Sequence, residues 1–304
     1  MTKNAIVVDE TEHPVGPSAY AAAEIDIRDF LDLEQFPIHE LGDPKRAELV
    51  AHARAGLEGD GCVVIPQFVS AKAVEEMRAE AIRLLGKARS GEETMNPYFS
   101  ADDESLPKDH PKRIFSRRSS TYINSDELEP TSLLRKFYDS DVVVHFISEC
   151  LNVGPLYRWA DPLGRNPYSI MHDGDYFPWH FDGNDFTVSL LVQESESGGE
   201  FEYCPNIRNA ESESFDDVKA VLKGDRSKVK SLQLRKGDLQ IFRGRHSLHR
   251  VTKTSGASPR IIALPSYVTN PYLVNRPKHS QSVYGRAMPI HVERERTRLD
   301  GLTD

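Results

Sequence analysis

The chain has 304 residues, of which 38% are hydrophobic and 28% charged, and its formal net charge is −9 at pH 7. This is the composition of a globular protein long enough to bury a large core, so a disordered or fibrous chain is excluded. The acidic balance gives no general attraction to nucleic acid or to anionic lipid, so neither partner is expected.

Cysteines and the N-terminal sequence indicate the compartment. Cys62, Cys150 and Cys204 are far apart, odd in number and outside any CxxC arrangement, which supports neither a disulfide framework nor a zinc ribbon. The first residues have neither the basic start nor the continuous apolar stretch of a secretory signal, and no run is long enough to span a bilayer. A cytoplasmic protein is therefore expected.

The first half of the chain reads as mainly helical. Residues 1–42 carry three prolines and are expected to form an N-terminal arm with one short helix around 23–33. Asp43 as N-cap and Pro44 at the first helical position predict a helix over 43–61, residues 62–69 read as a buried strand, and Ser70 begins a second helix. We expect a single domain over 43–304, with a helical part at 43–150; its catalytic character rests on the motifs given below.

Residues 90–130 are polar and turn-rich, and they are too long for an idle connector, which is typical of a lid or substrate loop. One or two helices are expected over 131–153. Short strand-like segments then dominate an all-β core at about 151–270, the part to which the resemblance given below assigns a β-barrel, followed by a C-terminal tail at 271–304. The expected strands lie within 166–175, 186–194, 199–205, 231–242, 249–254 and 260–268.

A possible metal site lies in the stretch "WHFDGNDFTVSLLVQ". Side chains alternate across a strand, so His180 and Asp182 are expected to share a face and to bind one ion together. A second histidine would complete the two-histidine, one-carboxylate set that leaves three positions open on ferrous iron. Both His246 and His249 are available for this role.

The order of these motifs carries a family resemblance. The HxD pair is followed by a histidine, His249, 67 residues after Asp182, and by an arginine, Arg260, eleven residues after that histidine. This arrangement resembles the Fe(II)/2-oxoglutarate-dependent oxygenase superfamily. "GDGCVVIPQFVSAKAVEEM" is similar to the segment that precedes the barrel in phytanoyl-hydroxylase-type members. "HPKR", "GDYFPWHFDGNDFTVSLLVQE", "GGEFEYCPNIR", "GDLQIFRGRHSLHRVT" and "YGR" are similar to the group of the free-lysine halogenase and its hydroxylase relatives.

The resemblance implies an α+β fold, a double-stranded β-helix (a jelly-roll or cupin-like barrel) with N-terminal helices packed on it. It also implies Fe(II), 2-oxoglutarate and O2 as cofactors. His180, Asp182 and His249 would hold the iron, because "LHRVT" is the family-like context, while His246 is left open as a residue behind the ligands.

The same resemblance implies a binding site for the keto-acid. Arg260 would bind its far carboxylate, since a bidentate guanidinium matches a planar anion. Ser169 and Met171 would border 2-oxoglutarate, with plain core packing as an equal alternative.

Substrate residues are also suggested by the relatives, which use an arginine near Arg117 and Arg118 to hold the substrate carboxylate; the alternative is a solvated basic pair. Phe177 and Gly183 stand where a lysine-binding relative would carry polar groups, which favours a less cationic substrate. Trp179 is expected to pack away from the metal. Two acidic residues could hold a cationic substrate or face solvent on an edge strand: Glu200 and Glu202.

The expected activity follows from Asp182. Halogenases of this group have glycine or alanine there, so a retained carboxylate favours hydroxylation of a C–H bond in a free amino acid or similar small polar metabolite. Desaturation or cyclisation by the same cofactors, a nucleic-acid or protein demethylase, and a non-catalytic metal-binding cupin-like sensor are the alternatives. We expect a small-molecule substrate, no nucleic-acid or membrane partner, and a possible homodimer.

Overall fold

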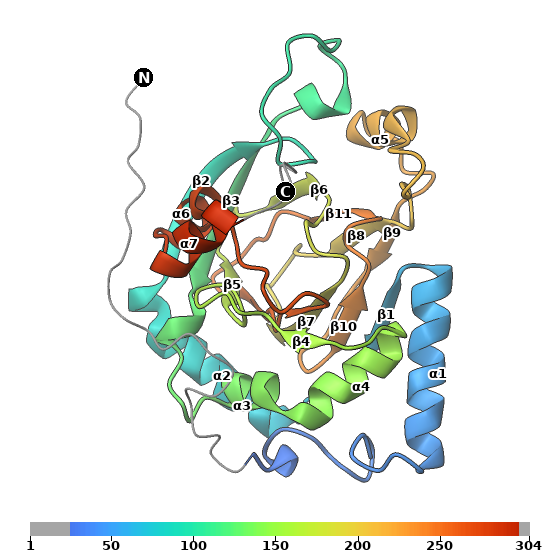
Figure 1. The fold of residues 1–304 in the computed structure, drawn as a ribbon, viewed down its shortest axis with the longest axis vertical. Helices are drawn as coiled ribbons and strands as arrows, with labels where there is room; N and C mark the ends of the chain where they lie inside the picture. The colour runs from blue at the N-terminus through green and yellow to red at the C-terminus, as the bar shows by residue number, and fades with distance from the viewer. Residues whose placement is uncertain (1–24, 298–304) are drawn as a thin grey trace.

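Two antiparallel sheets form the centre of the molecule in the computed structural model, which describes residues 25–297 (Figure 1). The larger sheet has the order β1 (Cys62–Ile65), β10 (Leu239–Phe242), β7 (Thr187–Gln193), β12 (Arg260–Ala263), β5 (Tyr168–Met171), β3 (Ser116–Ile123) and β2 (Arg89–Met95). The smaller sheet has the order β6 (Phe177–His180), β11 (Leu248–Val251), β8 (Phe201–Cys204) and β9 (Lys230–Leu232). A short pair joins β13 (Tyr267–Val268) to β4 (Tyr157–Arg158).

The inner faces of the two sheets meet through aromatic side chains. Phe201 of β8 lies edge-on to Phe242 of β10, with ring centroids 5.0 Å apart, and Tyr203 contacts the same ring from 5.8 Å. Cys62 of β1 belongs to the same buried cluster. Two sheets closed on each other in this way confirm the predicted double-stranded β-helix.

Helices cover the outer face of the larger sheet (Figure 1). Residues that alternate with the inner ones, such as Ile170, Val188 and Ile241, pack with helical side chains in the main core. Among the described residues the helices are α1 (Pro44–Gly59), α2 (Ala71–Leu84), α3 (Leu133–Asp139), α4 (Asp141–Leu151), α5 (Phe215–Leu222), α6 (Pro277–Tyr284) and α7 (Pro289–Thr297); of these, α5 packs against the smaller sheet instead. The 3-10 turns are η1 (Ile27–Asp29), η2 (Leu85–Lys87), η3 (Pro111–Arg113) and η4 (Ser125–Glu127).

The predicted helix starts are confirmed. The Asp43 carboxylate accepts from the amides of Lys45 and Arg46, at 2.7 and 3.3 Å, and the Ser70 hydroxyl accepts from Ala73 at 3.3 Å. Each cap satisfies amides that the first helical turn leaves without a backbone partner. Over 131–153 two helices form, α3 and α4.

The expectation of a turn-rich segment over 90–130 is wrong at both ends. β2 and β3 pair along seven residues, from Arg89 opposite Tyr122 to Met95 opposite Ser116, and they extend the larger sheet. The ribbon escaped prediction because most of β2 faces solvent, so its side chains are polar and lack an apolar alternation. Only residues 96–115 between the two strands form a long connection.

Three helices were not foreseen: α5, and α6 and α7 in the segment expected to be a tail. Within the expected N-terminal arm, residues 1–24 lie outside the described part, and 25–42 place Phe30, Leu31, Phe36 and Ile38 in the main core. The short helix expected around 23–33 is one 3-10 turn, η1. The division of the chain at residue 43 stays a prediction.

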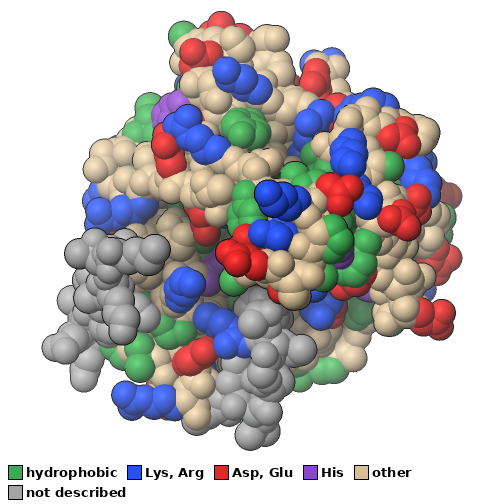
Figure 2. Space-filling model, turned by 90° about the horizontal axis from the view of Figure 1, so that it is seen from above, with side chains coloured by type: hydrophobic (Ala, Val, Ile, Leu, Met, Phe, Trp, Pro, Cys, Tyr) green, Lys and Arg blue, Asp and Glu red, His purple; other side chains and the backbone are tan. Residues whose placement is uncertain are grey.

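Charged side chains are mixed over the surface. On the face seen in Figure 2, basic and acidic groups lie among one another rather than in one large patch. Within residues 25–297, no helix has both the length and the apolar character needed to cross a bilayer.

Candidate metal centre

Two strands and one turn bring three potential ligands together. His180 is the last residue of β6, and His249 on β11 lies directly opposite it in the antiparallel register. Asp182 lies in the turn after β6 rather than on the strand. The prediction that strand alternation puts it on the same face as His180 is therefore wrong. The turn brings its carboxylate to the histidines instead.

The three ligand atoms converge closely enough for one ion. Oδ1 of Asp182 lies 3.6 Å from Nε2 of His180 and 3.4 Å from Nε2 of His249, and one ligand atom from each residue falls within 4.8 Å of the others. Nδ1 of each histidine faces a backbone carbonyl, that of Pro178 at 2.9 Å and that of Ser247 at 3.0 Å. A carbonyl only accepts, so Nδ1 carries the proton and Nε2 keeps its lone pair for a metal.

The Asp182 carboxylate is held from behind. Thr187 Oγ1 donates to Oδ2 of Asp182 at 2.6 Å. The backbone amide of Asp182 donates to the carbonyl of Gly244 at 3.1 Å. Any Cβ at position 244 would clash with this carboxylate, so only glycine fits there. Oδ2 is thus occupied and Oδ1 faces the histidines.

Electrostatics favour the metal-binding protonation states. Burial, aided by the neighbouring His249, lowers the pKa of His180 to about 4, so its imidazole is neutral at pH 7. Burial alone would raise the pKa of Asp182, but the two histidines outweigh it and hold that pKa well below its ordinary value. A neutral imidazole beside a carboxylate is a donor set for a borderline divalent ion such as Fe(II).

Arg260 places a charge in the barrel interior. It is 4% exposed, and burial lowers the pKa of its guanidinium to about 10. It lies opposite Met171 in the β12–β5 register, and Ser169 lies two residues along on the same face of β5. Within the described chain no hydrogen bond or ion pair balances Arg260, so a bound anion would relieve an unfavourable burial.

The two candidate arginines of β3 point to opposite sides. Arg117 is exposed and pairs with Glu92. Arg118 is 5% exposed, donates to the Tyr122 hydroxyl at 2.7 Å, and lies 4.2 Å over the Phe177 ring. Its Nε has no hydrogen-bond partner among the described residues.

Phe177 connects Arg118 to the metal ligands. Its ring stacks on the His180 imidazole, with centroids 3.9 Å apart and planes 6° from parallel. The structure therefore brings Arg118, Phe177 and the ligand cluster together, and it leaves Arg117 outside.

The other residues singled out from the sequence lie away from the metal ligands. His246 is outside the cluster, and burial lowers its pKa. Trp179 packs with Phe181 and Leu248, as expected, on the side opposite the ligands. Gly183 offers its carbonyl to Arg245 at 3.1 Å.

Glu202 is neither solvent-facing nor free for a substrate. It is 7% exposed and accepts from Arg226 at 2.8 Å and from Arg250 at 2.6 Å. Glu200 accepts from the Thr252 hydroxyl at 2.9 Å. Both lie at or beside β8, which is an inner strand of the smaller sheet and not the expected edge.

A cleft of about 490 Å³ lies on the outer side of the smaller sheet. Trp179 and Arg250 line it, and these side chains alternate with His180 and His249 along their strands. The cleft is therefore separate from the metal centre.

Sequence reasoning missed three residues at the centre: Thr187, Gly244 and Phe99. The Phe99 ring lies 5.7 Å from the His180 ring and nearly perpendicular to it. No local pattern marks Phe99, because it enters the site from the connection between β2 and β3. Thr187 and Gly244 are recognisable only from their contacts with Asp182.

The sequence matches the family model described as Halogenase D over residues 45–282, well over half of the chain. The chain belongs to the Halogenase D family. As a member, it is an enzyme of the Fe(II)/2-oxoglutarate-dependent oxygenase superfamily, which confirms the resemblance in the motifs. No curated protein matches the sequence.

Solved structures show more distant likeness to this Halogenase D family member. AviO1 from Streptomyces viridochromogenes Tue57 is 16% identical, with 76% of this chain and 97% of that one covered and a TM-score of 0.49. The epimerase SnoN from nogalamycin biosynthesis is 16% identical, with 73% and 81% covered and a TM-score of 0.49. A 2OG-Fe(II) oxygenase family oxidoreductase from Burkholderia pseudomallei is 12% identical, with 73% and 92% covered and a TM-score of 0.47.

Proposed function

We propose that this enzyme hydroxylates an unactivated C–H bond of a free amino acid or similar small polar metabolite. One atom of dioxygen enters the product, and the other enters the succinate formed, with CO2, from 2-oxoglutarate. The observation that carries the proposal is the cluster of two buried histidines, His180 and His249, with the half-buried Asp182, in which a carboxylate already fills the third protein position. A filled position disfavours binding of chloride there, and thus halogenation.

The residues fit the cofactors in two independent ways. Two histidine Nε2 atoms and Asp182 Oδ1 would hold Fe(II), and Arg260 would bind the far carboxylate of 2-oxoglutarate beside Ser169 and Met171. When bound, iron and the keto-acid supply the oxidising power for the C–H bond. Thr187 keeps one carboxylate oxygen away from the metal and so preserves the open positions.

Arg118 is the residue we assign to the substrate carboxylate. Its Nη1 lies 3.7 Å from the Glu93 carboxylate, but its buried Nε–H has no hydrogen-bond partner among the described residues, so a second anion there would satisfy it. Phe177 separates this guanidinium from His180, and the two groups occupy both faces of its ring. The ring therefore has no face left for a substrate ammonium, which supports a substrate less cationic than lysine.

The test is an anaerobic titration of the metal-free protein with Fe(II) and then 2-oxoglutarate, followed by the visible charge-transfer band of the chelate. We expect the band in the wild type and in His246→Ala, the matched control, and its loss in His249→Ala. A band that persists in His249→Ala, or no band in an iron-loaded wild type, would contradict the assignment.

A second experiment separates the possible reactions. Amino acids are screened by succinate release in the presence of chloride, and products are identified by mass spectrometry. We expect the gain of one oxygen without a chlorine isotope pattern; a chlorinated or desaturated product would replace the proposed reaction. The cytoplasmic location and the homodimer stay predictions.

A further inference from the structure

An aromatic ring reaches the metal centre from the connection that follows β2. The centroid of Phe99 lies 5.7 Å from that of His180, with an interplanar angle of 80°. Phe177 stacks on the same imidazole from β6. His180 is thus flanked by two phenyl rings that come from different parts of the chain.

The backbone at Phe99 is left-handed, with φ at 52°. A bulky side chain rarely adopts this conformation, and the surrounding structure must stabilise it. The contacts that hold the turn should therefore be strong and local.

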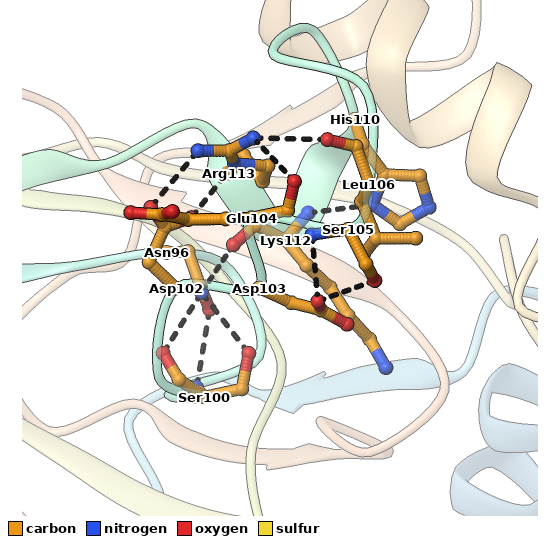
Figure 3. Close-up of polar contacts among 10 residues, drawn as sticks. All are labelled: Asn96, Ser100, Asp102, Asp103, Glu104, Ser105, Leu106, His110, Lys112 and Arg113. Atoms are coloured by element: carbon orange, nitrogen blue, oxygen red, sulfur yellow. Dashed lines mark hydrogen bonds and ion pairs between the residues drawn. The ribbon is translucent and has the colours of Figure 1, made fainter.

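Asn96 provides those contacts. Its buried side-chain amide donates to the Ser100 carbonyl at 2.9 Å, to the Ser100 hydroxyl at 3.0 Å and to the Lys112 carbonyl at 2.7 Å (Figure 3). Its oxygen accepts from the amides of Tyr98 and Ser100 at 3.0 and 3.2 Å. These bonds hold residues 96–100 in a turn that the Phe99 amide closes by donating to the Asn96 carbonyl at 3.1 Å.

The turn is also fixed to the segment that carries the ligands. The Phe181 amide donates to the Pro97 carbonyl at 2.9 Å, and the Tyr98 and Phe181 rings lie 5.3 Å apart. Farther along, Arg113 pairs with Asp102 at 2.9 Å and donates to the Leu106 carbonyl at 2.9 Å, which closes the rest of the connection on itself (Figure 3).

We propose that Phe99 is a preformed wall that shields the His180 side of the metal centre from water, and that Asn96 is the residue that positions it. Because its turn is fixed by Asn96 and by the Pro97–Phe181 hydrogen bond, Phe99 can exclude solvent without a movement of the connection. The role in the reaction rests on the proposed function, because water exclusion matters there for productive oxidation. The shielding of His180 does not depend on it.

The shielding can be measured without metal. Diethyl pyrocarbonate modifies accessible neutral imidazoles, and mass spectrometry of peptides gives the rate at His180. We expect a several-fold faster modification in Phe99→Ala and the wild-type rate in Phe99→Leu, which keeps an apolar side chain. Phe115→Ala is the matched control, a phenylalanine of the same connection that is 37% exposed.

Two results would overturn the wall: a wild-type rate at His180 in Phe99→Ala, or an equal acceleration in Phe115→Ala. Positioning by Asn96 is tested with Asn96→Asp, which keeps the acceptor but loses the three donated bonds. We expect His180 to react faster although Phe99 is present, with native circular dichroism as the folding control. Ser100→Ala removes one of these bonds and should give a smaller acceleration; no change in either folded variant refutes the positioning role.

The iron-loaded enzyme links the wall to the proposed function. Without substrate, Phe99→Ala should oxidise 2-oxoglutarate several-fold faster than the wild type, while Phe115→Ala should not. The wild type could lack the chelate band while His180 still reacts faster in Phe99→Ala. That result would refute the proposed function alone. A normal band with unchanged His180 reactivity in Phe99→Ala would refute the wall alone.

Discussion

Arg260 is a buried cation without a hydrogen-bond or ion-pair partner among the described residues. Burial lowers its pKa from 12.5 to about 10, and the depressed pKa of a base means that the charged form destabilises the folded state at neutral pH. Each pKa unit corresponds to about 1.4 kcal/mol, so the penalty is roughly 3 kcal/mol.

Replacing Arg260 with methionine should therefore stabilise the ligand-free protein by about 1 to 3 kcal/mol, because it removes an uncompensated charge. The same change should abolish the stabilisation that 2-oxoglutarate gives the metal-loaded protein. Urea denaturation measures both effects, with the exposed Arg235→Met as control. A less stable Arg260→Met protein that still responds to 2-oxoglutarate would show that the cation has another partner.

Thr187 should determine how Asp182 binds the metal. Thr187→Val removes the hydroxyl that occupies Oδ2, so metal affinity should fall by about 10- to 100-fold, as is typical when a partner of a ligand is lost. Thr187→Ser keeps the hydroxyl and should retain most of the affinity. Competition titration with a chelator distinguishes them, and equal affinities in Val and Ser variants would contradict the role.

The HxD pair could be predicted from the sequence because its chemistry leaves few alternatives, whereas the choice of His249 over His246 needed the family resemblance. Arg260 and Met171 could be predicted only through the family resemblance, and the structure places them opposite each other. Phe99 and Thr187 could not be predicted, because their importance depends on the contacts that the folded chain makes.

A buried hydrogen bond between a histidine and a carboxylate fixes α7 to the body of the molecule. Asp161 accepts from the amides of Leu163, Gly164 and Asn275, at 2.8 to 2.9 Å, and its Oδ2 lies 3.0 Å from His291 Nε2. His291 Nδ1 accepts from the Met288 amide at 2.8 Å, so Nε2 carries the proton that Asp161 receives. The attachment of the C-terminal helix thus depends in part on this carboxylate.

That dependence predicts a pH effect. Burial would raise the pKa of Asp161, but the hydrogen bonds from His291 and from the backbone amides outweigh it and lower the pKa. A lowered folded pKa gives stability that is complete above the ordinary aspartate value of about 4 and is lost as the pH falls through the folded pKa.

Asp161→Asn should destabilise the protein by about 3 kcal/mol at pH 7, because donors that faced a carboxylate are left with a poorer acceptor. The difference from the wild type should shrink in acid, once the wild-type carboxyl is itself protonated. Denaturation curves at several pH values check this, and a difference that is constant down to strongly acidic pH would contradict the pKa direction.

At the level of elements, local signals predicted what local contacts build. The caps of α1 and α2 are short-range hydrogen bonds, and both were readable from Asp43 and Ser70. β2 and β3 depend on pairing with each other and with β5, so their polar sequences concealed them. When a strand forms because it pairs with a neighbouring strand, its own sequence need not show alternating hydrophobic residues.

At the scale of the whole molecule, the barrel and its helical cover could be predicted in outline, since a helical part followed by many short strands is an uncommon order. The way the N-terminal strands complete the larger sheet could not, because it joins segments that the sequence keeps far apart. The first strand, β1, and two strands of the last quarter of the chain, β10 and β12, share this sheet.

The pairing of β1 with β10 also constrains the order in which the protein can be made. Within the described sheets, β1 (Cys62–Ile65) pairs with one strand, β10 (Leu239–Phe242). The ribosome must therefore synthesise most of the chain before β1 can pair. Until then the apolar strand and the faces of α1 and α2 remain exposed in the nascent chain, a state that favours aggregation and recruits chaperones. His249 emerges after β10, so iron acquisition is a late event, restricted to a nearly finished polypeptide.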